Sequence, residues 1–230
     1  MRSERRKFVV ILALFFSTFA FSLTICIDPG HQKEADLTLE PIAPGSETTK
    51  ARVSTGTRGS STGIPEYVFN LEFSFMLRDR LLQEGYEVVM TRDSHDVNIS
   101  NVERAKIANE ANADLCIRVH ADYSSDSSLK GFMLLIPSET SAQSPLIYSD
   151  SKKAAEKIMA SLLQIDGIDS LGIRPRDDIT GFNWSEVPVL IFEAGFMSNP
   201  EEDVLLSTRD YREKLVEALV TGIEDYFLTK

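Results

Sequence analysis

Short apolar segments alternate with longer helical segments along most of this chain, and this alternation limits the possible folds more than any other feature. Strand-like apolar runs lie at residues 24–28, 86–91, 114–120, 131–137 and 188–193. Helical spacing of apolar residues runs through residues 65–84, 101–112, 152–164 and 209–227. Strands and helices alternating at these lengths predict a mostly parallel sheet with helices on both faces. We therefore expect a single α/β domain.

The length and composition agree with one domain that has a packed core. The 230 residues are 43% apolar and 26% charged, which is ordinary for a globular protein. The formal net charge of −11 argues against nucleic-acid binding, because phosphate contacts need clustered Lys and Arg. Two cysteines exclude a disulfide scaffold and a zinc site of four thiolates. Cys26 and Cys116 fall inside predicted strands, so we expect buried free thiols.

The amino terminus has the pattern of an export segment. Arg2, Arg5, Arg6 and Lys7 precede an apolar run of about 15 residues, which is shorter than a bilayer span requires. Residues 1–22 are therefore predicted to be a signal peptide or, second, an uncleaved N-terminal membrane anchor, and residues 23–230 to be the folded domain. Both alternatives place that domain outside the cytoplasm, secreted or attached to the membrane.

Two of the three histidines directly follow predicted strands. His31 follows strand 24–28 and His120 ends strand 114–120, so a parallel sheet brings both to one edge. Zinc takes neutral His nitrogen readily and needs a third ligand, for which Glu66 in the first turn of helix 65–84 is the natural candidate. The alternative is two hydrogen-bonded structural histidines and a Glu that only caps its helix. The remaining His95 is expected to be a solvated loop residue.

Glu193 ends the apolar strand 188–193 and is expected at the same edge of the sheet. Burial there raises a carboxyl pKa, which suits a general base or acid that works near neutral pH. The alternative is a carboxylate that accepts hydrogen bonds from loop amides. Residues 32–63 are rich in Gly, Ser, Thr and charge and show little periodicity, so we expect a long functional loop.

At these residues the sequence resembles the zinc-dependent N-acetylmuramoyl-L-alanine amidases of bacterial cell walls. The resemblance covers residues 24–227. It is carried by ordered motifs at residues 27–31, at Glu66 with Asn70-Leu71, at 85–92, at Glu103-Arg104, and at 108–114, 119–121 and 188–199. The family commonly has a short glycine-rich loop where this chain has residues 32–63, and the longer form looks like a subgroup found in clostridia-like bacteria.

The resemblance implies a peptidoglycan hydrolase with one bound Zn²⁺. His31, Glu66 and His120 are the implied zinc ligands, and Glu193 is the implied catalytic carboxylate. The implied reaction is cleavage of the amide between N-acetylmuramic acid and the first L-alanine of the stem peptide by zinc-activated water. Because no wall-binding module is apparent, the protein is expected to find peptidoglycan through its own groove or through a protein partner.

Other interpretations of the same residues remain open at this point. A catalytically inactive domain that binds peptidoglycan or activates another hydrolase, and a zinc peptidase that cuts within the stem peptide, are the two alternative functions. Asp28 either orients His31 or shapes the turn at the end of its strand. Arg174 either holds a stem-peptide carboxylate or forms an ordinary surface ion pair.

Overall fold

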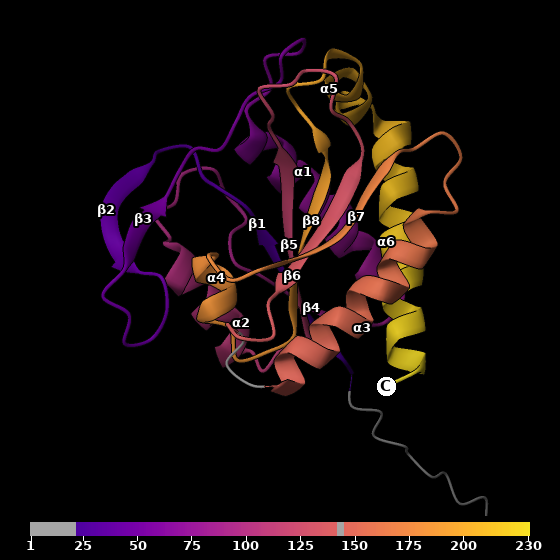
Figure 1. The fold of residues 1–230 in the computed structure, drawn as a ribbon. Helices are drawn as coiled ribbons and strands as arrows, with labels where there is room; N and C mark the ends of the chain where they lie inside the picture. The colour runs from indigo at the N-terminus through magenta and orange to yellow at the C-terminus, as the bar shows by residue number, and fades with distance from the viewer. Residues whose placement is uncertain (1–21, 142–144) are drawn as a thin grey trace, which may run out of the picture.

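The computed structural model describes residues 22–141 and 145–230, and within these residues six strands form one sheet (Figure 1). The strands are β1 (Thr24–Pro29), β4 (Glu87–Met90), β5 (Leu115–Asp122), β6 (Phe132–Pro137), β7 (Ser170–Arg176) and β8 (Val189–Phe196). Their order is β4-β1-β5-β8-β6-β7. Neighbouring strands run parallel except β6, which is antiparallel to β8. The prediction of a mostly parallel sheet is confirmed.

Helices cover both faces of this sheet, as predicted. One face packs against α1 (Glu66–Gln83), α3 (Pro145–Leu162) and α6 (Arg209–Leu228), and the other against α2 (Asn101–Glu110) and the short α4 (Thr180–Asn183). Figure 1 shows α3 and α6 side by side, and they are in extensive contact. The helix α5 (Pro200–Ser207) follows β8 directly. Ser100 and Glu103 begin α2 with a capping box.

Successive side chains of the central strands point to opposite faces of the sheet, and this alternation decides where the polar groups lie. On β1, Ile25 and Ile27 enter the larger apolar core beneath α1, α3 and α6, whereas Cys26 belongs to the smaller cluster on the α2 face. Residues two positions apart share a face, so the α2 face of the three central strands becomes polar towards their carboxyl ends. The polar residues on it are Asp28 of β1, Arg118 and His120 of β5, and Glu193 of β8.

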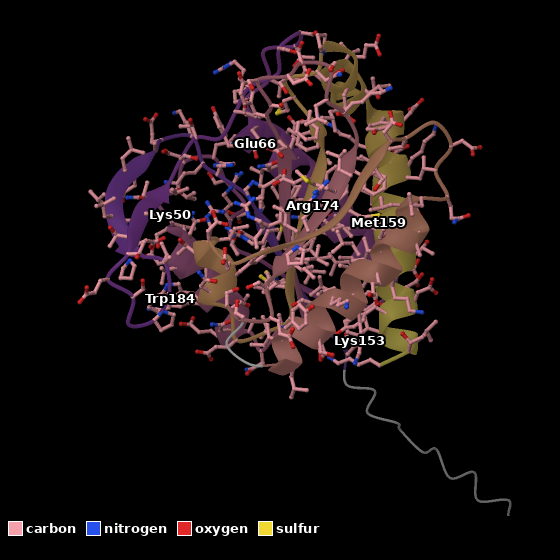
Figure 2. The ribbon with its side chains drawn as sticks, viewed as in Figure 1. Lys50, Glu66, Lys153, Met159, Arg174 and Trp184 are labelled. Carbon is pink, nitrogen blue, oxygen red and sulfur yellow. The ribbon has the colours of Figure 1, made fainter. Side chains whose placement is uncertain are left out.

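Residues 32–63 are not the continuous loop that we expected. They contain an antiparallel hairpin of β2 (Asp36–Pro41) and β3 (Thr49–Val53), which projects beside the main sheet in Figure 1. Leu37 and Leu39 of β2 alternate with polar residues but are 68% and 67% exposed, so this short ribbon does not bury an apolar face in the core. Trp184, labelled in Figure 2, donates from Nε1 to the Pro41 carbonyl and helps to dock the hairpin.

Four further elements differ from the sequence-based expectation. The helix expected at 152–164 begins earlier, at Pro145, and β7, α4 and α5 were not predicted. β7 is an edge strand that contains Gly172 and Pro175 and ends in exposed residues, so it lacks the apolar run of a buried strand. Cys26 and Cys116 are buried free thiols, as predicted.

The predicted export segment, residues 1–22, falls almost wholly outside the described residues. Among the helices of the described part, none combines the length and the apolar run that a bilayer-spanning segment needs.

Candidate metal centre and catalytic site

The turn after β1 presents His31 in a backbone conformation that few non-glycine residues adopt. Its φ is +61°, in the left-handed region, which costs free energy and is found most often at functional sites. The turn is held by the Gly30 amide, which donates to the Val119 carbonyl at 3.0 Å, and by Arg104 Nη2, which donates to the His31 carbonyl at 2.9 Å. The surrounding structure therefore stabilises an otherwise unfavourable turn.

His31, Glu66 and His120 come together at this edge of the sheet. Glu66 Oε1 lies 3.2 Å from His31 Nε2 and 3.1 Å from His120 Nδ1. The two imidazoles meet edge to face with ring centroids 4.8 Å apart. One ligand atom from each of the three residues lies within 4.8 Å of the other two, which is close enough for one metal ion to contact all three. Figure 2 labels Glu66 at the start of α1.

The charge states of these side chains suit metal binding. Burial opposes ionisation of Glu66, but the adjacent imidazoles of His31 and His120 outweigh it and hold the pKa of this carboxyl well below its usual range. Burial lowers the pKa of His120 to about 4, although the Glu66 carboxylate opposes this shift. At neutral pH the trio therefore includes a carboxylate and a neutral His120 ring, the forms in which these groups bind metals.

One ring nitrogen of the trio has no partner, and the backbone passes close to the three side chains. His120 Nε2 is buried without a hydrogen-bond partner among the described residues. A Cβ added at Gly30 would lie 2.2 Å from His120 Cε1, and one added at Gly56 would lie 2.4 Å from Glu66 Oε2. Two glycines thus allow the backbone to close around the donor groups. The donor set and its tight enclosure fit a single zinc ion.

Glu193 lies beside this trio on the neighbouring strand. It is the register partner of His120 between β5 and β8, and its side chain is buried. Burial is the main cause that raises the pKa of Glu193 well above its usual range, and the nearby carboxylates of Glu66 and Asp122 add to the shift. Its Oε2 atom has no hydrogen-bond partner within the described residues. The carboxyl group that we predicted for acid–base chemistry is therefore buried and partly unpaired.

Asp28 does not contact the His31 ring, so the hypothesis that it orients this imidazole is wrong. Its two carboxylate oxygens are taken by buried arginines, with Arg104 Nη1 2.7 Å from Oδ1 and Arg118 Nε 2.7 Å from Oδ2. Because Arg104 also holds the carbonyls of Pro29 and His31, Asp28 supports the turn through Arg104. This is closer to the alternative that Asp28 shapes the end of its strand.

The side chain that contacts His31 Nδ1 is Ser54, which sequence reasoning missed. His31 Nδ1 lies 2.9 Å from Ser54 Oγ and 3.1 Å from the Ser54 carbonyl oxygen. A carbonyl oxygen only accepts, so this pairing favours a hydrogen on Nδ1 and leaves Nε2 free to coordinate a metal. The amide of Thr57 donates to Glu66 Oε2 at 2.9 Å, and Asn70 Nδ2 donates to Oε1 at 3.2 Å.

The sequence held only a weak signal for these supporting contacts. Ser54 and Thr57 belong to residues 32–63, where we expected a functional loop but could not name its contacts. Arg104 and Asn70 occur in the motifs that carry the family resemblance, yet nothing in their spacing indicated partners.

Two other predicted residues have different surroundings from those expected. His95 is half-buried rather than solvated, and its ring packs edge to face on Tyr67 with centroids 5.4 Å apart. Arg174 is exposed on β7, and its side chain has no ion-pair or hydrogen-bond partner among the described residues. It lines a surface hollow that also contains Asp122 and Met133. The ordinary surface ion pair proposed for Arg174 is therefore not formed.

The fold and this cluster define an α/β domain with a candidate metal centre at the carboxyl ends of its central strands. The N-acetylmuramoyl-L-alanine amidase family model matches residues 25–225, and this chain belongs to that family. By class it is an enzyme that hydrolyses peptidoglycan at the amide between N-acetylmuramic acid and L-alanine, and the resemblance noted in the sequence is confirmed.

Known proteins of similar sequence and structure bear this name. The N-acetylmuramoyl-L-alanine amidase Rv3717 of Mycobacterium tuberculosis is 28% identical over 218 residues, which cover 90% of this chain and 88% of the relative. The crystal structure of the amidase Ami1 from Mycobacterium smegmatis matches with a TM-score of 0.81 at 26% identity, covering 90% of this chain and 98% of the other. An amidase from Clostridium difficile 630 shares the fold, with a TM-score of 0.75 at 22% identity over 91% of this chain and 98% of the other.

Proposed function

We propose that this amidase works with one zinc ion held by His31, Glu66 and His120, and that Glu193 is its catalytic carboxylate. The observation that carries this proposal is the position of Glu66 Oε1, 3.2 Å and 3.1 Å from nitrogens of two separate imidazoles. Three protein ligands of this kind leave one coordination position open, as in catalytic rather than structural zinc sites. When bound, zinc acidifies a water molecule and polarises the carbonyl of the scissile amide.

Glu193 supplies the proton transfers that amide hydrolysis requires. Its Oε2 atom is buried and unpaired within the described residues, and its raised pKa brings the carboxyl closer to the working pH. We assign to Oε2 the acceptance of a proton from the attacking water. The same oxygen then delivers this proton to the nitrogen of the departing L-alanine, which leaves as a neutral amine.

The proposal also covers where the enzyme acts. Its substrate lies outside the cytoplasmic membrane, and residues 1–22 carry the charged-then-apolar pattern of an export segment. We propose that these residues deliver the domain to the cell wall, either as a cleaved signal peptide or as a membrane anchor. The domain then reaches peptidoglycan through its own groove or with the help of a protein partner.

Digestion of purified peptidoglycan tests this proposal directly. The zinc-loaded chain is expected to release stem peptides that begin with L-alanine and to leave the glycan strands intact, and a chelator is expected to stop the release. Glu193→Gln should bind zinc normally and lose turnover, whereas Glu156→Gln, on the exposed face of α3, should leave both unchanged.

The products separate the alternatives. Cleavage inside the stem peptide would show a peptidase, and no release at any zinc concentration would show a domain that only binds the wall. Full activity of Glu193→Gln would refute the role assigned to this carboxyl group.

A further inference from the structure

A surface hollow of about 440 Å³ adjoins the catalytic edge of the sheet. Met133 and Leu129 contribute partly exposed apolar surface to it, and Asp122 lies two residues after His120. Met133 is also the register partner of Glu193 between β6 and β8, so the hollow begins one strand away from the proposed catalytic carboxyl. A substrate held with its scissile bond at Glu193 would therefore pass over or into this hollow.

The far side of the hollow is lined by two arginines of β7. Arg174 and Arg176 stand two residues apart in the strand and so share one of its faces. Asp178 holds Arg176 through two hydrogen bonds of 2.8 and 2.9 Å and also pairs with Lys50 of the hairpin at 3.2 Å. Arg174, labelled in Figure 2, has no such partner among the described residues. Its guanidinium is free to bind a ligand.

The charge of this face is unusual for the chain. The formal net charge is −11, yet two guanidinium groups flank one hollow. Asp122 is the acidic residue among those that line the hollow. Both arginines lie on β7, which neighbours β6 in the sheet, and β6 pairs with β8 beside Glu193. A ligand with a negative group fits beside the arginines.

The spacing between strands gives the distance from Glu193 to the two arginines, which can be compared with the length of a stem peptide. β7 lies two strands away from β8, which is about 10 Å at the usual strand spacing. An extended peptide covers about 10 Å in three residues. The second and third residues of a stem peptide, counted from the scissile amide, are therefore at the distance of the arginines.

We propose that Arg174 is a specificity-determining residue that binds a free carboxylate on the second or third residue of the stem peptide, with Arg176 beside it. This inference rests on the proposed function, because it assumes that the scissile amide lies at Glu193. The planar guanidinium binds a carboxylate through two parallel hydrogen bonds. The apolar surface of Met133 and Leu129 receives the aliphatic parts of the peptide.

The test compares two synthetic muramyl tripeptides that differ only in whether the stem carboxylates are free or amidated. The zinc-loaded wild-type chain is expected to prefer the free-carboxylate substrate. Arg174→Gln should lower kcat/KM for that substrate by about 10- to 100-fold and leave the amidated substrate almost unaffected. Arg174→Lys keeps the charge but loses the two-pronged geometry, so it should lie between the two.

Arg209→Gln is the matched control, because this substitution removes the same charge. Arg209 is exposed at the start of α6, which packs on the opposite face of the sheet from Met133 of the hollow. An equal effect of Arg174→Gln on both substrates, no effect on either, or the same effect from Arg209→Gln would overturn the inference. A second measurement is the binding of the free stem tripeptide, which needs no turnover. If the wild-type chain cleaves neither substrate, the proposed function fails. The binding measurement still decides the role of Arg174: the wild-type chain should bind the amidated tripeptide more weakly than the free-carboxylate tripeptide, and Arg174→Gln should abolish this difference.

Discussion

Gly30→Ala is expected to damage the metal centre by displacing one of its proposed ligands. A methyl group at this position would lie 2.2 Å from His120 Cε1 and 2.6 Å from Nδ1, whereas unbonded carbons normally stay about 3.5 Å apart. The ring must therefore move by roughly 1.3 Å, far more than the tolerance of about 0.2 Å in a metal–ligand distance. Misplacement by about 1 Å costs about 100-fold in rate, or about 2.7 kcal/mol of transition-state stabilisation.

The assay for this variant measures zinc affinity by competition with a chromogenic chelator and kcat/KM on a soluble muramyl peptide. Both should fall together, because one displaced ligand affects both. Gly45→Ala is the control, since Gly45 lies in the hairpin turn with a positive φ and open space around its Cα. It should lower thermal stability slightly and leave zinc affinity unchanged. Wild-type zinc affinity and activity in Gly30→Ala would refute the steric argument.

Three other outcomes follow from the contacts around the turn after β1. Ser54→Ala removes the hydroxyl that contacts His31 Nδ1 at 2.9 Å, so zinc affinity measured by calorimetry should fall by about 10- to 100-fold, with little change in the melting temperature of the metal-free chain. Asp28→Asn leaves the buried Arg104 and Arg118 without their charged partner and should lower the free energy of unfolding in urea by about 3–5 kcal/mol; a loss below 1 kcal/mol would contradict this. Burial alone would raise the pKa of Asp28, but the two arginines outweigh it and hold that pKa below the unfolded value of 3.8. The stabilisation by the ionised Asp28 carboxylate is therefore present above about pH 4 and is lost as the pH falls further. The wild type should accordingly lose stability below about pH 4 more steeply than Asp28→Asn.

Most of the secondary structure could be predicted because its signals are local. The helix at Glu66–Gln83 and the strands at Leu115–Asp122 and Val189–Phe196 follow from the spacing of apolar residues over a few turns or strand positions. The hairpin at Asp36–Val53 escaped prediction because its strands bury almost no side chains of their own. It is held by contacts to Trp184 and α2, and those partners are distant in the sequence.

The amino-acid sequence by itself determined that His31, His120 and Glu193 would stand at one edge of the sheet, because each follows a short apolar strand and parallel strands end together. Only the tertiary structure decided which atoms meet: that Glu66 Oε1 lies between two imidazoles, that Ser54 rather than Asp28 contacts His31, and that the Arg174 side chain has no partner within residues 22–141 and 145–230. The physical reason is that periodicity is a property of neighbouring residues. A hydrogen bond or ion pair between distant segments instead requires ångström-scale placement, which arises only when the whole core has packed.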